Sequence, residues 1–244
     1  MLPLKDNIPS RRFPVLTVSI IAICVAVYFL FEQSFWSLSS IGEERVTELG
    51  ATPCDLTSLG EGRGNCPAGD EPWWLTVLTS MFLHGSLLHL AGNMLFLWIF
   101  GNNIEDSMGR GRFVAFYLLG GVAALAGQVA IDPDATAPTV GASGAIAAVL
   151  GGYAVLYPRA RVVSVIFIII FFTIVELPAL LVLGLWILMQ ILFGLGDLGE
   201  PVGGESGVAY FAHIGGFLFG ALTIKLWANR VHEDYELAGR VPVY

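Results

Sequence analysis

Seven stretches without charged residues divide this chain, and their lengths constrain its fold more than any other feature. A helix that crosses a bilayer needs about 20 consecutive apolar residues. Six stretches reach that length, whereas residues 162–175 form a run of only 14, which is more typical of an interfacial or re-entrant segment. Charged residues make up 13% of the chain and the mean hydropathy is +0.73. This composition is far from that of an ordinary soluble domain.

We therefore expect an all-α integral membrane protein, a bundle of six transmembrane helices in one domain over residues 1–244. The first stretch is as long as a span and lacks the small residues of a signal-peptide cleavage site, so we expect it to be retained. The expected spans are 13–31, 85–104, 113–131, 139–158, 177–196 and 206–225, with 162–175 lying at or dipping into one face and a large first outer loop over 32–73.

Basic residues lie almost entirely on one side of this topology. With the N-terminus inside, the inner segments hold ten Lys and Arg residues, and the outer loops hold only Arg45 and Arg63. Because loops rich in Lys and Arg stay in the cytoplasm, we expect both termini to be cytoplasmic. We expect a multi-pass protein of a bacterial plasma membrane, with the lipid bilayer around it. The net charge of −8 argues against a nucleic-acid partner, which a basic face would bind.

The outer loop contains two of the three cysteines. Cys54 and Cys66 share a compartment in which oxidation is chemically allowed, so they form either a disulfide that closes the loop or two reduced thiols. Cys24 falls within the first span and is interpreted as a small packing residue.

Three of the expected helices place polar side chains at one depth. Counted from the outer end of each span, His89 and Ser143 are fifth, His213 is eighth and Asn93 is ninth. At a rise of 1.5 Å per residue, these side chains lie about 7–14 Å below the outer boundary. A serine and a histidine in one layer of the bilayer indicate nucleophilic chemistry inside the membrane.

The helical faces support the same grouping. His89 and Asn93 are four residues apart and share a face, whereas His84 points elsewhere and is interpreted as a structural hydrogen-bonding residue. Small residues, Gly144 on one helix and Gly216 with Gly220 on another, would let two helices approach closely. Taken singly, each feature has a simpler explanation. A membrane serine often bonds its own backbone, and glycines are ordinary packing residues.

The ordered motifs resemble the rhomboid family of intramembrane serine proteases. The resemblance extends from about Trp73 to Gly220. Its elements are His84-Gly85-Ser86-Leu87-Leu88-His89-Leu90-Ala91-Gly92-Asn93, Gly101 with Glu105, Gly141-Ala142-Ser143-Gly144, and Ala212-His213 with Gly216 and Gly220.

The resemblance implies a function and a set of roles. Ser143 and His213 would form a catalytic dyad, and His89, Asn93 and the Ser143 backbone N–H would stabilise the oxyanion. His84, Gly141, Gly144, Gly216 and Gly220 would be structural residues near the site. Substrates would be single-span membrane proteins cleaved near the outer boundary through an acyl-enzyme. No metal, nucleotide or other cofactor is expected.

The chain departs from the family pattern at two places. Many members carry Trp-Arg in the first outer loop, whereas this chain has Trp73-Trp74-Leu75. Some members have an aromatic ring one turn after the serine, where this chain has Ala147. An imidazole at His213 would then need another stacking partner. Glu176 is expected at the inner end of a helix, so no carboxylate is available as a third catalytic member.

Other functions fit the sequence less well. Gly194-Leu195-Gly196-Asp197 and Pro178-Ala179-Leu180 look like presenilin-type elements, but they occur in reverse order and no Tyr-Asp partner lies within an expected helix. A zinc protease would need a His-Glu-x-x-His motif, and a transporter would need charged residues along a path. The alternative to an enzyme is a catalytically silent rhomboid-like factor for membrane-protein binding or quality control.

Overall fold

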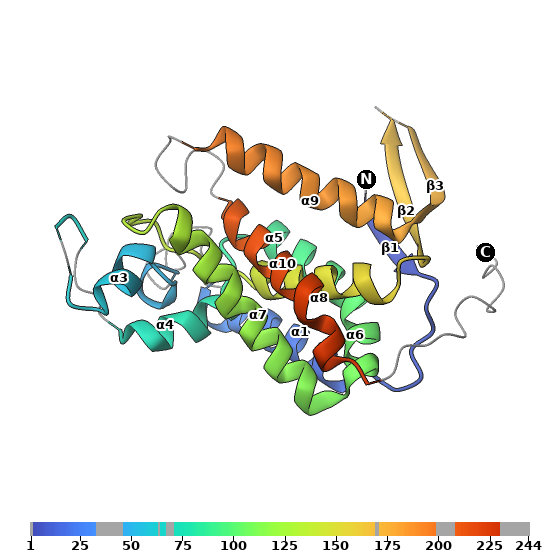
Figure 1. Cartoon of the computed structure of the whole chain (residues 1–244), viewed down its shortest axis with the longest axis horizontal. Helices are drawn as coiled ribbons and strands as arrows, with labels where there is room; N and C mark the ends of the chain where they lie inside the picture. Colours follow the sequence, from blue (N-terminus) through green and yellow to red (C-terminus); the bar gives the residue numbers. More distant parts are fainter. Residues whose placement is uncertain are drawn as a thin grey trace.

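A computed structural model describes residues 2–32, 46–62, 64–66, 71–168, 171–198 and 208–229. A helix occupies each of the six long apolar stretches (Figure 1). These helices are α1 (Val15–Val27) with the π-helical turn η1 (Tyr28–Glu32); α5 (Leu87–Phe96), the π-helical turn η3 (Leu97–Gly101) and α6 (Asn102–Met108) in one continuous segment; α7 (Arg110–Ile131); α8 (Ser143–Leu156); α9 (Ala179–Gly196); and α10 (Tyr210–Trp227).

Three helical segments are long and apolar enough to cross a bilayer. They are Leu87–Met108, Arg110–Ile131 and Ala179–Gly196. The apolar helices Val15–Phe31 and Ser143–Leu156 are shorter. The fold is therefore mostly helical, as the sequence predicts, while six spans and cytoplasmic termini stay predictions.

Helix α8 lies at the centre of the bundle. Every residue from Gly144 to Tyr153 is buried, and α7 and α10 pack against this helix. Small residues make this packing close: a side-chain carbon on Gly120 would lie 2.5 Å from the Ala148 Cβ. Helices pack tightly in a membrane when small residues let their backbones approach. The small apolar residues of α8 thus allow it to pack closely against both α7 and α10.

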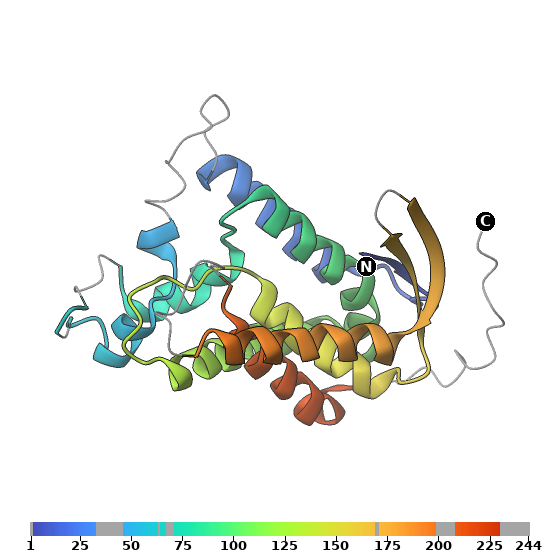
Figure 2. The ribbon, with the colours of Figure 1, turned by 90° about the horizontal axis from the view of Figure 1, so that it is seen from above.

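The all-α prediction is wrong at residues 162–175. This segment forms most of a hairpin of β2 (Arg161–Ile168) and β3 (Phe171–Pro178), and β1 (Leu2–Asp6) pairs with β2 in a three-stranded antiparallel sheet. The segment is rich in Val, Ile and Phe, which pack well on a pleated surface. The sheet lies at one end of the molecule (Figures 1 and 2). The expected interfacial or re-entrant segment is therefore a strand pair joined to the N-terminus.

Helix α8 begins at Ser143 instead of at residue 139. The preceding residues bond elsewhere: Thr139 forms an isolated bridge with Ala51, and the Gly141 N–H donates to the Ser80 carbonyl at 2.8 Å. Gly141 has φ +125°, which is a left-handed conformation that favours glycine. Ser143 is consequently the first residue of its helix, not the fifth. The expected start of the last span, residue 206, lies outside the described residues.

The described part of the first outer loop contains two short helices. These are α3 (Pro53–Ser58) and α4 (Trp73–Thr79), and the 3-10 turn η2 (Ser80–Phe82) follows α4. A disulfide joins Cys54 to Cys66, with their Cα atoms 5.9 Å apart. Both helices lie at the end of the molecule opposite the sheet (Figure 2).

Two buried carboxylates tie the N-terminal segment to the bundle. Glu105 accepts hydrogen bonds from the backbone N–H groups of Leu16 and Thr17 at 3.1 and 2.8 Å, and from the Thr17 hydroxyl at 2.9 Å. These N–H groups lie in the first turn of α1, where a negative charge is favourable. Asp6 accepts from the Tyr153 hydroxyl and from the Asn103 amide, both at 2.6 Å. The carboxylates hold α1 and β1 against the ends of α6 and α8.

Candidate functional site

Ser143 and His213 belong to two different helices, and their side chains face each other. The His213 Nε2 lies 2.8 Å from the Ser143 Oγ, although 70 residues separate them in the chain. Ser143 opens α8, and His213 is near the start of α10. This distance is that of a hydrogen bond between a hydroxyl and an imidazole nitrogen. The pair therefore has the geometry that a serine nucleophile and its general base require.

Glycines bring these two helices into contact beside the pair. A side-chain carbon on Gly216 of α10 would overlap the carbonyl oxygen of Gly144 in α8. On its other side Gly144 faces α7, where a side-chain carbon would lie 2.6 Å from the Ala124 Cβ. The residues predicted to be small and close to the site are thus in backbone contact. Larger residues would separate Ser143 from His213.

His89 lies beside the serine across Gly141. A side-chain carbon on Gly141 would lie 2.9 Å from the His89 Nε2 and 3.4 Å from the Ser143 Oγ. The His89 ring and the Ser143 hydroxyl therefore pack closely around this glycine, where a side chain would collide with the imidazole.

Asn93 is buried, with 8% of its surface exposed. Among the residues that the structure describes, its Nδ2 has no hydrogen-bond partner. Buried polar groups are nearly always paired, so an unpaired donor in a candidate site suggests a bound group or a catalytic role. His89 and Asn93 both belong to α5.

His84 precedes α5 and is almost completely buried, with 1% exposed. Its Nδ1 lies 3.2 Å from the Phe82 carbonyl oxygen, and its ring centroid lies 5.3 Å from that of His89. Burial, together with the nearby His89, lowers the pKa of His84 to about 4. His84 therefore contacts His89 and local backbone.

Two residues of α9 that the sequence analysis missed contact His213. The Gln190 Oε1 lies 2.7 Å from the His213 Nδ1. The Trp186 ring lies 5.7 Å from the imidazole, centroid to centroid, with a tilt of 38°. Trp186 thus provides the aromatic contact for which Ala147, which is fully buried, is too small. The available signal was the spacing of four residues, which puts both side chains on one helix face.

A third missed residue supports the backbone next to His213. The Ala212 N–H donates to the Gln128 Oε1 at 3.1 Å, and Gln128 is buried on α7. Polar residues in apolar helices are rare and usually face the bundle interior. Neither glutamine was among the serine, histidine and asparagine residues that were grouped by their depth along the expected spans.

The other acidic candidates lie away from the dyad. Glu176 belongs to β3 and forms an ion pair with Arg161, with 2.9 Å between Oε1 and Nε. Asp197 follows the last turn of α9, where its N–H donates to the Phe193 carbonyl. Neither carboxylate is hydrogen-bonded to His213 in the described structure.

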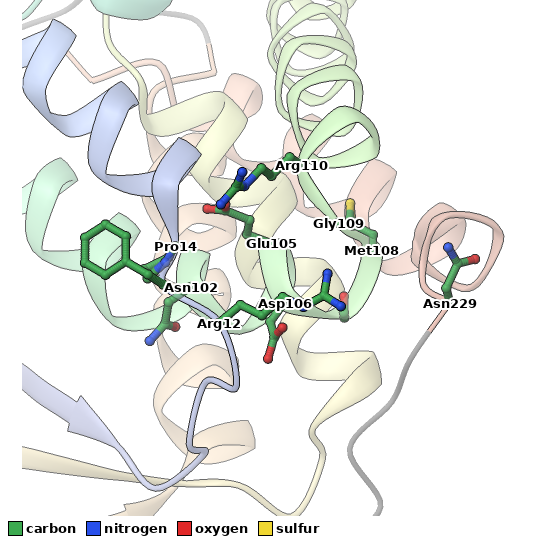
Figure 3. Close-up of a pocket in the computed structure, with 11 residues that line it drawn as sticks. Arg12, Pro14, Asn102, Glu105, Asp106, Met108, Gly109, Arg110 and Asn229 are labelled. Atoms are coloured by element: carbon green, nitrogen blue, oxygen red, sulfur yellow. The ribbon is translucent and has the colours of Figure 1, made fainter.

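A pocket of about 370 Å³ opens where α6 and α7 meet. Figure 3 shows Arg110 reaching over Glu105, and Arg12 beside Asp106. The Asp106 Oδ2 accepts from the Arg11 N–H at 2.8 Å. The pocket borders the first residue of α7, Arg110. The residues next to the dyad instead contact Ala124 and Gln128 of this helix, about 21–27 Å further along its axis. The pocket is therefore separate from the candidate site and has a balanced set of charges.

Comparison with known proteins assigns most of the chain to one family. The model of the Rhomboid domain matches residues 71–230. The chain is 35% identical to the rhomboid protease GluP of Bacillus subtilis over 144 residues, which is 59% of this chain and 24% of that protein. It is 33% identical to the human mitochondrial presenilin-associated rhomboid-like protein over 165 residues, which is 63% of this chain and 39% of that protein.

A third relative is the mitochondrial rhomboid protein 1 of Saccharomyces cerevisiae, with 28% identity over 152 residues, 61% of this chain and 40% of that protein. The chain therefore spans a quarter to two fifths of the length of these curated relatives. The matched region contains every residue of the candidate site, from His84 to His213.

Proposed function

Because the chain belongs to the Rhomboid family, we propose that it is an intramembrane serine endopeptidase that cleaves single-span membrane proteins near the outer membrane boundary. Family membership and the apolar helices make it an integral membrane protein. The name of the Bacillus subtilis relative, a rhomboid protease, supports the assignment to a peptide-bond hydrolase.

The hydrogen bond between His213 and Ser143 is the observation that carries this proposal. At 2.8 Å, the His213 Nε2 can accept the Ser143 proton while the Oγ attacks the carbonyl carbon of the scissile peptide. When the carbon–nitrogen bond breaks, His213 returns that proton to the leaving amine. The products of this step are the amine fragment and an ester on Ser143.

The negative oxygen of the tetrahedral intermediate would be stabilised by three donors. Asn93 has a buried Nδ2 that is unpaired within the described part of the chain, and the His89 ring lies against Gly141 beside Ser143. The Ser143 backbone N–H lies at the first residue of α8, where helical N–H groups have no acceptor within the helix. Such donors stabilise charge strongly where water is scarce.

Water completes the proposed reaction. His213 would take a proton from water, which attacks the ester carbon, and would then return it to the Ser143 Oγ. The site would need no metal, nucleotide or other cofactor. The proposed substrate class rests on membership of the Rhomboid family and on the predicted depth of the dyad.

We place the protein in a bacterial plasma membrane with both termini in the cytoplasm. The asymmetry of basic residues supports the orientation. The match to a rhomboid protease of Bacillus subtilis supports a bacterial membrane. Some relatives are mitochondrial, so localisation of a fluorescent fusion in the source cell is the direct test.

Labelling with a fluorophosphonate tests the proposal. Purified wild-type protein should become covalently labelled and should cleave a single-span reporter, and Ser143→Ala should do neither. Ser19→Ala is a matched control, because within the described residues the Ser19 hydroxyl donates to the Val15 carbonyl one turn earlier in α1. This variant should label like wild type. A folded wild-type protein that neither labels nor cleaves would instead be the catalytically silent rhomboid-like factor.

A further inference from the structure

The second ring nitrogen of His213 is also hydrogen-bonded. Its Nε2 faces Ser143, and its Nδ1 lies 2.7 Å from the Gln190 Oε1. Gln190 comes from α9, and 9% of its surface is exposed. Figure 1 shows α9 along one side of the bundle, beside the start of α10. The imidazole is therefore held from two helices.

The Gln190 amide has a defined orientation. Its Nε2 donates to the Trp186 carbonyl one turn earlier in α9, at 3.4 Å. This bond turns the Oε1 toward the imidazole. An amide oxygen can only accept, so the His213 Nδ1 must carry the proton. The Nε2 then has a free electron pair toward the Ser143 hydroxyl, as a general base requires.

Trp186 adds a second constraint on the same imidazole. It lies four residues before Gln190 and so on the same face of α9. Its ring is 5.7 Å from that of His213 and also 6.3 Å from that of Phe217. The amide thus sets the proton on the imidazole, while the indole limits how far the ring can tilt.

We propose that Gln190 is a positioning residue that holds His213 in the tautomer and orientation needed to activate Ser143. This inference rests on the proposed protease function and adds a third member to the dyad. A neutral amide suits this place, because a carboxylate in the membrane interior would carry a large desolvation cost. The protein would thereby orient its base without burying a charge.

Three variants separate positioning from packing. Gln190→Leu removes the acceptor at similar volume, and Gln190→Glu keeps an acceptor oxygen. Gln128→Leu is the matched control, because Gln128 is an equally buried glutamine that bonds backbone next to His213 instead of the ring. Each is compared with wild type in kcat and KM for a single-span reporter, in thermal stability, and in the ¹⁵N spectrum of labelled histidine.

We expect Gln190→Leu to lower kcat by about 10- to 100-fold, by analogy with the loss of a group that orients a metal-binding histidine. KM should stay unchanged, and the Nδ1-protonated signal of His213 should weaken. Gln190→Glu should retain more of kcat than Gln190→Leu, because it keeps an acceptor oxygen, but should lower thermal stability, because a carboxyl group there is costly to desolvate. Gln128→Leu should lower stability without changing the tautomer.

Two results would overturn the proposal. One is a wild-type kcat in Gln190→Leu. The other is a parallel fall of kcat and melting temperature with an unchanged histidine spectrum, which a packing role alone would produce. Failure of the protease assignment is distinguishable, since wild-type protein would then show no labelling while the histidine spectra still report the tautomer.

Discussion

Gly220 of α10 lies directly against the carbonyl oxygen of Ala148 in α8. An added side-chain carbon at Gly220 would overlap the carbonyl oxygen and lie 2.7 Å from the carbonyl carbon and 2.9 Å from the Cα of Ala148. The backbones of the two helices that hold the dyad are therefore in contact, one turn of α10 beyond Gly216.

Gly220→Ala should destabilise the protein by about 1–3 kcal/mol, the typical cost of overpacking a tight contact. The added methyl group forces rigid backbone apart and should also move His213 from Ser143. Gly184→Ala is the control, because a side-chain carbon there meets nothing within 4 Å. This control should be neutral or gain up to about 1 kcal/mol of helix propensity. Thermal unfolding and the rate of fluorophosphonate labelling measure both effects. Equal stability of the two variants would refute the contact.

Asn93→Ala should reduce kcat by about 100- to 1,000-fold, or roughly 2.7–4 kcal/mol, as loss of one oxyanion donor does in soluble serine proteases. KM should change little, because the donor acts on charge that develops after binding. His84→Ala is the control and should mainly reduce stability, since His84 is 1% exposed. The two assigned roles would be wrong if Asn93→Ala kept the wild-type kcat while His84→Ala lost kcat without losing stability.

Stability should depend on pH through Asp6. Burial raises the pKa of this carboxyl from 3.8 to about 7, against the lowering effects of the Tyr153 hydrogen bond and Lys5. Below about pH 4 the carboxyl is protonated in both the folded and the unfolded state, and its contribution to the stability of the folded state is largest. Between pH 4 and 7 the unfolded chain ionises first, so the folded state loses stability as the pH rises. The melting temperature of wild type should therefore be higher near pH 5 than near pH 8. This difference should be smaller in Asp6→Asn, which lacks the titrating carboxyl. An identical pH dependence in Asp6→Asn would contradict this assignment.

Removing the disulfide should affect the outer loop and spare the dyad. Cys54 and Cys66 are separated by 12 positions, and closing a loop of this size contributes about 3 kcal/mol in the chain-entropy model. The double variant Cys54→Ser/Cys66→Ser should show faster hydrogen exchange in α3 and an unchanged labelling rate at Ser143. Mass spectrometry without reduction should find the bridge in wild-type protein from an oxidising compartment. Free thiols in that sample would refute it.

The orientation of α8 can be tested with single cysteines at its two ends. Asp134 and Arg159 are exposed and lie on either side of this helix. The asymmetry of basic residues predicts that Asp134→Cys reacts with a membrane-impermeant reagent from outside, and Arg159→Cys only after the membrane is opened. Both variants need a Cys24→Ser background. Reaction of both cysteines from the same side would rule out the predicted topology.

Much of the fold and the candidate site could be predicted because the signals are local. Charge-free runs mark the helices, since the length of a span and the cost of burying charge act on consecutive residues. Helical spacing put His89 and Asn93 on one face, and small residues indicated where α8 and α10 could meet. Depth counted along the chain then grouped Ser143 with His213, even though α8 begins four residues later than predicted.

Tertiary structure decided what depends on residues far apart in the chain. The pairing of β1 with β2 places Leu2 opposite Val165. The sequence pattern of residues 162–175 does not indicate that the N-terminus is its partner. The turn at Gly141 exists because its own N–H bonds to the Ser80 carbonyl and Thr139 pairs with Ala51 instead of extending α8. Gln190 looks like a lone polar residue on an apolar helix until α9 packs beside α10. A hydrogen bond depends on distance and angle in three dimensions, so only the folded chain reveals that this amide faces His213.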